Sequence, residues 1–165
     1  MRPARIPIGL QLTQASRAVS RAFDDALAAA GGSLPFWLVL LSLKTQDLSS
    51  QRELAAAVGI REATLTHHLA AMETAGLVSR RRDAANRRIQ LVELTPAGDA
   101  AFHRLREVAI AFDKRLRRGI AAGEVAALED VLRRMSANVT PRGRRQDASG
   151  RASQLPWAGL AEDAD

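Results

Sequence analysis

The stretch that decides the fold runs from Ser50 to Gly98 and reads SQRELAAAVGIREATLTHHLAAMETAGLVSRRRDAANRRIQLVELTPAG. Its first half contains two short helical patterns, over about 51–58 and 61–75. Gly59 stands between them, and glycine tolerates the positive φ that ends one helix before the next begins. The spacing therefore predicts two helices joined by a tight turn.

The second half of the stretch predicts a two-stranded ribbon. The runs 77–80 and 88–94 have the composition of strands, and the segment between them contains Asp and Asn, which form turns. In the second run Ile89 and Leu91 alternate with polar residues, as in a half-buried strand. Helix, turn, helix and ribbon in this order predict a winged helix-turn-helix over about residues 47–95.

Helical patterns also lie on both sides of this unit. Residues 9–30 are amphipathic, whereas 35–45 are apolar nearly all round, which indicates a helix buried on most sides. After the unit, Thr95-Pro96 starts a helix that reaches about residue 118, and another covers about 123–137. The first and the last of these helices carry more apolar surface than a small monomer needs, so we expect the flanking helices to pair two copies of the chain.

The expected fold is thus mainly α with a small β-wing: a winged helix-turn-helix flanked by N- and C-terminal dimerisation helices, at about 9–30 and 96–138. Together these elements form one predicted domain over residues 9–139. The Pro and Arg residues of 1–8 predict a flexible arm. Gly, Pro, Ser and mixed charge predict a disordered tail over 140–165.

The composition favours an acidic partner. Of 24 basic residues only Lys44 and Lys114 are lysines, the other 22 are arginines, and the net charge is +6. Arginine binds phosphates and guanine edges with a planar fork of donors, which suits nucleic acid. A GC-rich genome would also enrich arginine, but it would not explain where the arginines cluster.

Other features of the sequence exclude whole classes of protein. The absence of Cys excludes a disulfide scaffold, a thiolate zinc site and a cysteine redox sensor. The N-terminus has no secretory apolar core, and the longest apolar run, 34–43, is too short to span a bilayer. We therefore expect a cytoplasmic protein with no membrane partner.

The second helix of the pair has the two faces that a DNA-reading helix needs. Leu65, Leu69 and Met72 form an apolar stripe, and the opposite face is small and polar. The N-terminal half of that face would enter the major groove, where an Arg can bind guanine and a Thr can meet a thymine methyl or a phosphate. An ordinary surface helix is the alternative. The predicted base readers are Arg61, Ala63, Thr64, Thr66 and His67.

The predicted wing carries the densest positive charge in the chain. Between Ser79 and Arg88 there are five arginines against one acid, and like charges on one turn repel unless phosphates neutralise them. An arginine at such a turn can also reach a narrow minor groove. A merely solvated loop is the alternative. The predicted wing contacts are Arg80, Arg81, Arg82, Arg87 and Arg88.

A third contact is expected where the first helix of the pair begins. Ser50 and Glu53 have the spacing of a capping box, in which each satisfies an amide of the first turn. Helix N-termini attract anions, so Ser50 and Gln51 are predicted to contact a DNA phosphate.

Several of these residues together resemble the MarR family of bacterial winged-helix regulators. The matching residues are Leu34-Pro35 with Trp37, Thr66-His67-His68-Leu69, Gly76-Leu77-Val78, Arg80, Asn86-Arg87-Arg88 and Leu94-Thr95-Pro96-Ala97-Gly98. The resemblance covers roughly residues 9–139. It implies an obligate dimer that presents two winged helices to an inverted-repeat operator, with half-sites about one helical turn apart.

The resemblance also bears on the wing and on a ligand. Arg88 matches the Arg of the family's Asp-x-Arg wing motif, but Asn86 replaces the Asp, so Asp83 or Glu93 is left as the candidate brace. Family members often bind small aromatic or anionic effectors between the dimer helices and the winged helix. Phe36 and Trp37 lie where such a cleft is expected, although a role as core aromatics is the alternative.

Neither a metal site nor an active site is expected. His67 and His68 are adjacent and point about 100° apart on a helix, so they cannot share one ion, and His103 stands alone. No Gly-rich phosphate loop, Gly-x-Ser-x-Gly sequence or paired carboxylates in an apolar setting occur. We predict no cofactor and no catalysis.

The sequence predicts a homodimeric, sequence-specific DNA-binding regulator, a repressor released by a small ligand. Two other interpretations stay open: a non-specific nucleoid-type DNA-binding protein, and a protein-interaction module on the same fold.

Overall fold

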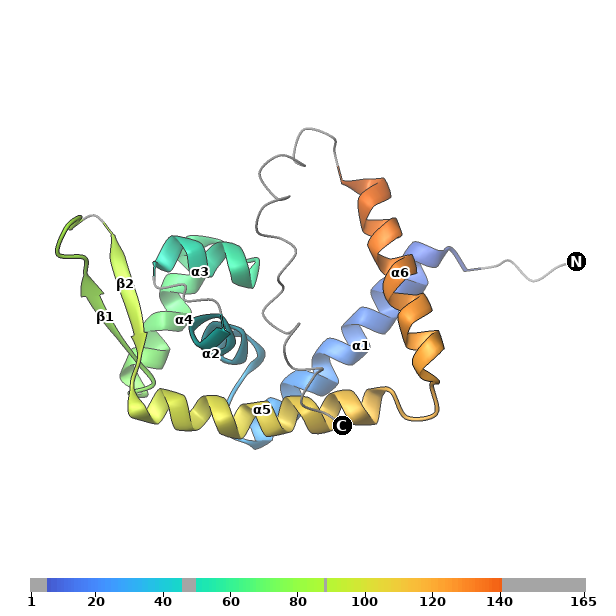
Figure 1. Cartoon of the computed structure of the whole chain (residues 1–165), viewed down its shortest axis with the longest axis horizontal. Helices are drawn as coiled ribbons and strands as arrows, with labels where there is room; N and C mark the ends of the chain where they lie inside the picture. The colour runs from blue at the N-terminus through green and yellow to red at the C-terminus, as the bar shows by residue number, and fades with distance from the viewer. Residues whose placement is uncertain (1–5, 46–49, 88, 141–165) are drawn as a thin grey trace, which may run out of the picture. The chain divides into compact units, whose positions relative to one another are not determined.

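A computed structural model describes residues 6–45, 50–87 and 89–140 (Figure 1). These residues form two compact units, one up to Ala109 and one from Ile110 onward. The elements are α1 (Ile8–Ala29), α2 (Leu34–Thr45), α3 (Gln51–Val58), α4 (Glu62–Thr74), β1 (Val78–Arg82), β2 (Gln90–Leu94), α5 (Pro96–Leu116) and α6 (Ala122–Val139).

The predicted mainly α fold with a small β-wing is confirmed, and the differences lie at the ends of elements. Helix α1 begins at Ile8, inside the expected arm, and α6 extends to Val139. Strand β1 continues two residues further than expected, to Arg82, whereas β2 begins two residues later than expected, at Gln90. The expected connector 47–49 and the expected tail beyond residue 140 lie outside the described residues.

Helix α2 is the centre of the first unit. Its apolar sequence has no polar face, and Trp37, Val39, Leu40 and Leu41 are buried, as predicted. Asp24 of α1 fixes where α2 begins, since its carboxylate accepts a hydrogen bond from the Leu34 amide at 2.7 Å. The core around α2 contains Leu27, Leu54, Leu65, Leu69, Met72, Val78, Val92, Ala101, Phe102, Leu105 and Ala109.

The two helices of the central pair begin and end where their caps require. The Ser50 hydroxyl accepts a hydrogen bond from the Glu53 amide at 3.2 Å, which confirms the predicted N-cap of α3. Gly59 ends α3 at φ 76°, the left-handed conformation that favours glycine. Leu65, Leu69 and Met72 are fully buried and fix the inner face of α4.

Strands β1 and β2 form an antiparallel ribbon beside α3 and α4 (Figure 1). Val78 pairs with Leu94 at one end of the ribbon and Arg82 with Gln90 at the other, and Ser50 adds a single bridge to Leu91. Val92 is the buried residue of β2, whereas Ile89 is exposed before the strand begins. The expected half-buried alternation that included Ile89 is therefore wrong, because that residue lies at the turn.

A tight joint connects the end of the ribbon to α5. The Thr95 hydroxyl donates to the Gly76 carbonyl oxygen at 2.5 Å and accepts from the Gly98 amide at 3.0 Å. The Thr95 amide donates to the carbonyl oxygen of Leu77 at 3.2 Å. Gly98 lies against that same carbonyl group, so that a Cβ atom there would be only 1.9 Å from its oxygen.

The apolar surface of the chain lies mainly in helices that bury little within one copy. Helix α6 has no buried residue, and Leu128, Val131 and Val139 are exposed on it. The first part of α1 likewise exposes Ile8, Leu10 and Leu12. Among the described helices no single one has the length and apolar character to cross a membrane, and only the bent pair α1 and α2 passes on length and composition.

Candidate nucleic-acid interface

The outer face of α4 presents the five residues predicted to read bases. Arg61, Ala63, Thr64, Thr66 and His67 are all exposed, because the buried stripe of α4 lies on its other side. Arg61 is the N-cap residue of α4, and its side chain makes no capping hydrogen bond. His68 beside them is half-buried, as expected for a flanking residue.

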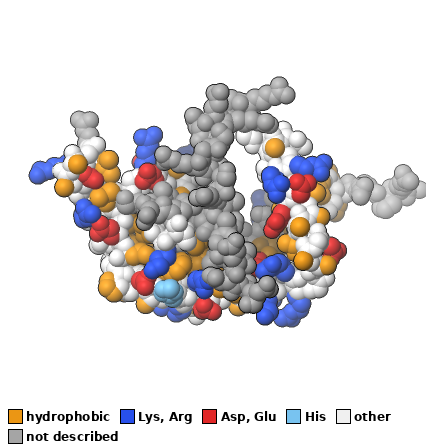
Figure 2. All heavy atoms as spheres, in the orientation of Figure 1, with side chains coloured by type: hydrophobic (Ala, Val, Ile, Leu, Met, Phe, Trp, Pro, Cys, Tyr) orange, Lys and Arg blue, Asp and Glu red, His pale blue; other side chains and the backbone are white. Residues whose placement is uncertain are grey.

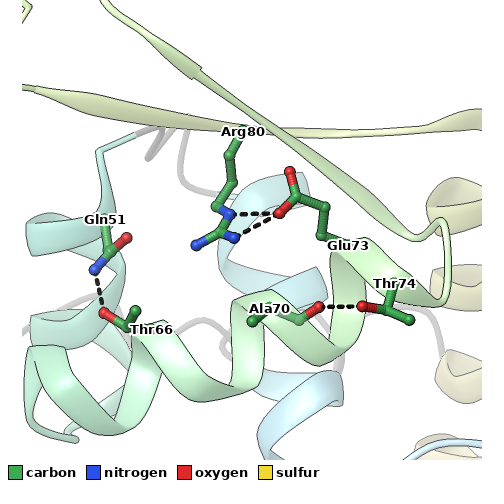
Figure 3. Close-up of polar contacts among 6 residues, drawn as sticks. All are labelled: Gln51, Thr66, Ala70, Glu73, Thr74 and Arg80. Atoms are coloured by element: carbon green, nitrogen blue, oxygen red, sulfur yellow. Dashed lines mark hydrogen bonds and ion pairs between the residues drawn. The ribbon is translucent and has the colours of Figure 1, made fainter.

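Two residues of this site are joined across the helix pair. The Gln51 side-chain amide of α3 donates to Thr66 Oγ1 of α4 at 2.6 Å (Figure 3). Thr66 Oγ1 in turn donates to the Glu62 carbonyl oxygen at 2.8 Å. The Ser50 hydroxyl is also engaged, since it donates to the Glu53 carboxylate at 2.8 Å. Of the two predicted phosphate contacts, Gln51 thus joins α3 to α4, whereas the Ser50 side chain caps α3.

Arg80 of the wing is bound to helix α4. Its Nε and Nη2 atoms donate to Glu73 Oε2 at 2.9 and 2.5 Å (Figure 3). Only 18% of the Arg80 side chain is exposed, against 40% for Glu73. These hydrogen bonds from Arg80 hold the pKa of Glu73 below its ordinary value, which keeps the carboxylate charged. The pair connects α4 to β1.

Arg81 is paired in the same way within the ribbon. Its Nε and Nη2 atoms donate to Glu93 Oε1 of β2 at 2.8 and 2.6 Å. The bond lowers the pKa of Glu93 and raises the pKa of Arg81. Figure 2 shows basic and acidic side chains next to each other over the wing. Two of the five wing arginines are therefore neutralised within the chain, by Glu73 and Glu93, which lie outside the local stretch from which the charge of the wing was counted.

The remaining wing arginines differ from these two. Arg82 and Arg87 are exposed and have no ion pair with any described residue. Arg88, the predicted family-motif arginine, lies outside the described residues. Arg82 and Arg87 are thus the described wing cations whose charge is available to a phosphate.

The turn of the wing is closed by Asp83. Its carboxylate accepts hydrogen bonds from the amides of Ala85 and Asn86 at 2.6 and 2.9 Å, and its own amide donates to the Ile89 carbonyl oxygen at 3.0 Å. Of the two candidate braces, Asp83 therefore fixes the backbone of the turn, whereas Glu93 fixes Arg81.

Arg52 is a candidate contact that the sequence interpretation missed. It is exposed in the first turn of α3 and has no ion pair within the described chain. A cation in a first turn is unfavourable beside the positive end of the helix dipole. That cost was a visible signal in the sequence, and a nearby phosphate would offset it.

The two aromatics predicted to meet a ligand have different surroundings. Trp37 is 2% exposed, and its ring stacks on that of Phe102 with centroids 5.7 Å apart. Phe36 is half-buried. The surroundings of Trp37 favour the core alternative, while a ligand contact by either residue stays a prediction. For metals, no group of three potential ligands occurs among the described residues.

Comparison with known proteins gives one consistent family. The MarR family model matches residues 33–90. The uncharacterised HTH-type transcriptional regulator YdgJ of Bacillus subtilis is 37% identical over 101 residues, which cover 61% of this chain and 62% of that protein. The match to this curated relative thus spans less than two thirds of its length.

Solved structures match over nearly their whole length. The transcriptional regulator PA3341 is 36% identical with a TM-score of 0.70, over 81% of this chain and 98% of that one. Bordetella bronchiseptica BpsR, whose DNA binding is regulated by 6-hydroxynicotinic acid, is 25% identical with a TM-score of 0.73, over 81% and 97%. With its winged helix-turn-helix and its family match, the chain belongs to the MarR family of transcriptional regulators.

Proposed function

We propose that the protein is a homodimeric regulator that binds a specific inverted-repeat DNA operator. The observation that carries this is the exposed face of α4 from Arg61 to His67, beside a wing with the available cations Arg82 and Arg87. The helix would read base edges in the major groove, and the wing would hold phosphates and reach the adjacent minor groove. Arg88 is proposed as a further wing contact.

The distribution of arginines indicates that α4 and the wing contribute differently to DNA binding. Arg61 is the one cation on the reading face of α4, so the helix itself contributes little attraction to phosphates. Arg82 and Arg87 supply charge from the wing, and Arg52 supplies it from α3. Because phosphate contacts position a protein and base contacts specify the site, this arrangement suits sequence-specific binding.

Dimerisation is supported by apolar surface that one copy leaves exposed. Leu128 and Val131 on α6 are 54% and 44% exposed, and Ile8 on α1 is 61% exposed. Burying such side chains in a second copy is favourable, and two-fold symmetry would match an inverted repeat. A protein with this partner acts where the chromosome lies, in the cytoplasm of a bacterium.

The proposal includes repression that a small effector relieves, and it includes no catalytic activity. Its support is the relative BpsR, whose DNA binding responds to an aromatic acid. Phe36 and Trp37 are the proposed aromatic contacts, and the effector class is a small aromatic or anionic molecule.

The test is binding of the purified chain to DNA from its own upstream region, with random DNA as competitor. Fluorescence anisotropy should show an affinity at least about a thousandfold higher for one site than for random DNA. Equal affinity for both would instead indicate a nucleoid-type protein. No binding to either DNA would favour the interpretation that the protein is a protein-interaction module on the same fold.

A further inference from the structure

Thr66 is the one predicted base reader whose polar atom is held on two sides within the described chain. Its hydroxyl donates to the Glu62 carbonyl oxygen at 2.8 Å. Its oxygen accepts from Gln51 Nε2 at 2.6 Å (Figure 3). A hydroxyl has one hydrogen to donate. Thr66 therefore has no donor left for a phosphate or for an acceptor on a base.

What Thr66 still offers to a partner is its γ-methyl group. The side chain is exposed although its oxygen is tied to the backbone of α4 and to α3. In the major groove the apolar partner of a Thr methyl is the C5-methyl of thymine, which cytosine and uracil lack.

Gln51 is the residue that fixes this orientation. Its Nε2 faces the Thr66 oxygen, and its Oε1 is buried without a hydrogen-bond partner among the described residues. A buried acceptor without a partner costs free energy, so this amide is poorly placed for stability alone. It is also turned toward α4, in contrast to a phosphate contact that would point outward.

We propose that Thr66 recognises a thymine in each operator half-site through its methyl group, and that Gln51 is the positioning residue that holds the Thr66 hydroxyl away from the DNA. This inference rests on the proposed function and assigns the base preference of the same site. Thr64 provides a matched control, because it is a threonine exposed on the same helix.

The experiment uses the full chain and a DNA site that it selects from a random library. Each thymine of the site is replaced by deoxyuridine, in both half-sites at once, and affinity is measured by fluorescence anisotropy. One thymine should respond with about a fourfold loss per half-site, or roughly fifteenfold in all, the effect expected for one buried methyl-sized group. The same measurements are made on Thr66→Ser, Thr66→Val, Thr64→Ser and Gln51→Ala.

Each variant has a distinct expected result. Thr66→Ser keeps both hydrogen bonds but should bind thymine and uracil sites equally, whereas Thr66→Val keeps the methyl and should retain the preference. Thr64→Ser should retain it too. Gln51→Ala should lose the preference for thymine over uracil, whereas a phosphate contact by Gln51 would show as an equal loss of affinity for the selected site and for random DNA.

The outcomes separate this inference from the proposed function. If the library yields no preferred site, the proposed function fails. Two results would overturn the assignment of the Thr66 methyl group while leaving the proposed function intact. In the first, a preferred site is found but replacing its thymines by deoxyuridine does not change the affinity. In the second, Thr66→Ser loses as much affinity on that replacement as the wild type. If Gln51→Ala weakens binding to the selected site and to random DNA equally, Gln51 contacts phosphate and its positioning role is overturned.

Discussion

Arg80 and Arg82 lie two residues apart on β1, and their surroundings give them different tasks. Arg80 is half-buried with its guanidinium on Glu73, whereas Arg82 is exposed without an ion pair among the described residues. An arginine that is already paired with a carboxylate neutralises no phosphate, so it displaces few of the counterions that are condensed on DNA. Of these two arginines, only Arg82 should therefore contribute to the salt dependence of binding.

Substitution of these two arginines should separate the tasks. Arg82→Ala should reduce the slope of log affinity against log salt by about 0.9 per contact, or about 1.8 for a dimer. Arg80→Ala should weaken binding through a loosened wing and leave the slope unchanged. Titrations between low and moderate salt measure both. An equal fall in slope for both variants would show that Arg80 leaves Glu73 to bind phosphate.

Gly98 is a residue where a single carbon atom should matter. A Cβ there would be 1.9 Å from the Leu77 oxygen, so Gly98→Ala must displace backbone and should lower the free energy of unfolding by about 3 kcal/mol. Gly123→Ala on α6 is the control, because no atom lies within 4 Å of its new Cβ, and it should be neutral or stabilising by up to about 1 kcal/mol. Urea unfolding measures both, and similar stabilities for the two variants would contradict the tight joint.

At the scale of elements, the wing is held to α4 by the ion pair between Arg80 and Glu73, so the stability of the fold should depend on pH in the acidic range. The folded-state pKa of Glu73 is lowered by its bonds from Arg80, so the unfolded chain binds more protons near pH 4. The stability that this pair contributes is therefore complete above the unfolded pKa of about 4.5 and is lost as pH falls through the lower folded value.

Glu73→Gln tests this pH dependence. The variant should be less stable than the wild type at pH 6, and the difference should shrink as the pH is lowered to 3, as followed by urea unfolding. Glu129→Gln, an exposed position on α6, should match the wild type at both pH values. A difference for Glu73→Gln that persists at pH 3 would mean that the Glu73 charge is not its cause.

The elements also differ in how far the sequence could predict them. Helix α4 was predictable, since the period of Leu65, Leu69 and Met72 fixes both its buried stripe and its exposed face. The ribbon was predictable as a ribbon but not in its charge state. The partner of Arg80 lies seven residues earlier on a helix, and that of Arg81 twelve residues later on the opposite strand. Such pairings depend on register and packing, which local composition does not encode.

For the whole molecule, the apolar surface of α6 should decide the oligomeric state. Leu128→Asp should weaken dimerisation by about a hundredfold, because two symmetry-related side chains each lose about 1.5 kcal/mol of burial. Sedimentation velocity measures the shift, and operator affinity should fall with it. Arg133→Ala on the same helix is the control and should remain a dimer. An unchanged dimer for Leu128→Asp would place the interface elsewhere.

The joint between Leu77, Thr95 and Gly98 has one more consequence. The first turn of α5 packs directly against the Leu77 carbonyl group, and hydrogen bonds of Thr95 tie it to Gly76 and Gly98. Helix α4, the ribbon and that turn are therefore expected to move together as one rigid unit. The proposed effector would therefore reorient this unit as a whole without changing its internal geometry. The winged helix-turn-helix of each copy should therefore bind an isolated half-site with the same affinity in the presence and in the absence of the effector. Only the distance between the winged helix-turn-helix units of the two copies should change. The affinity for a complete operator should change with it.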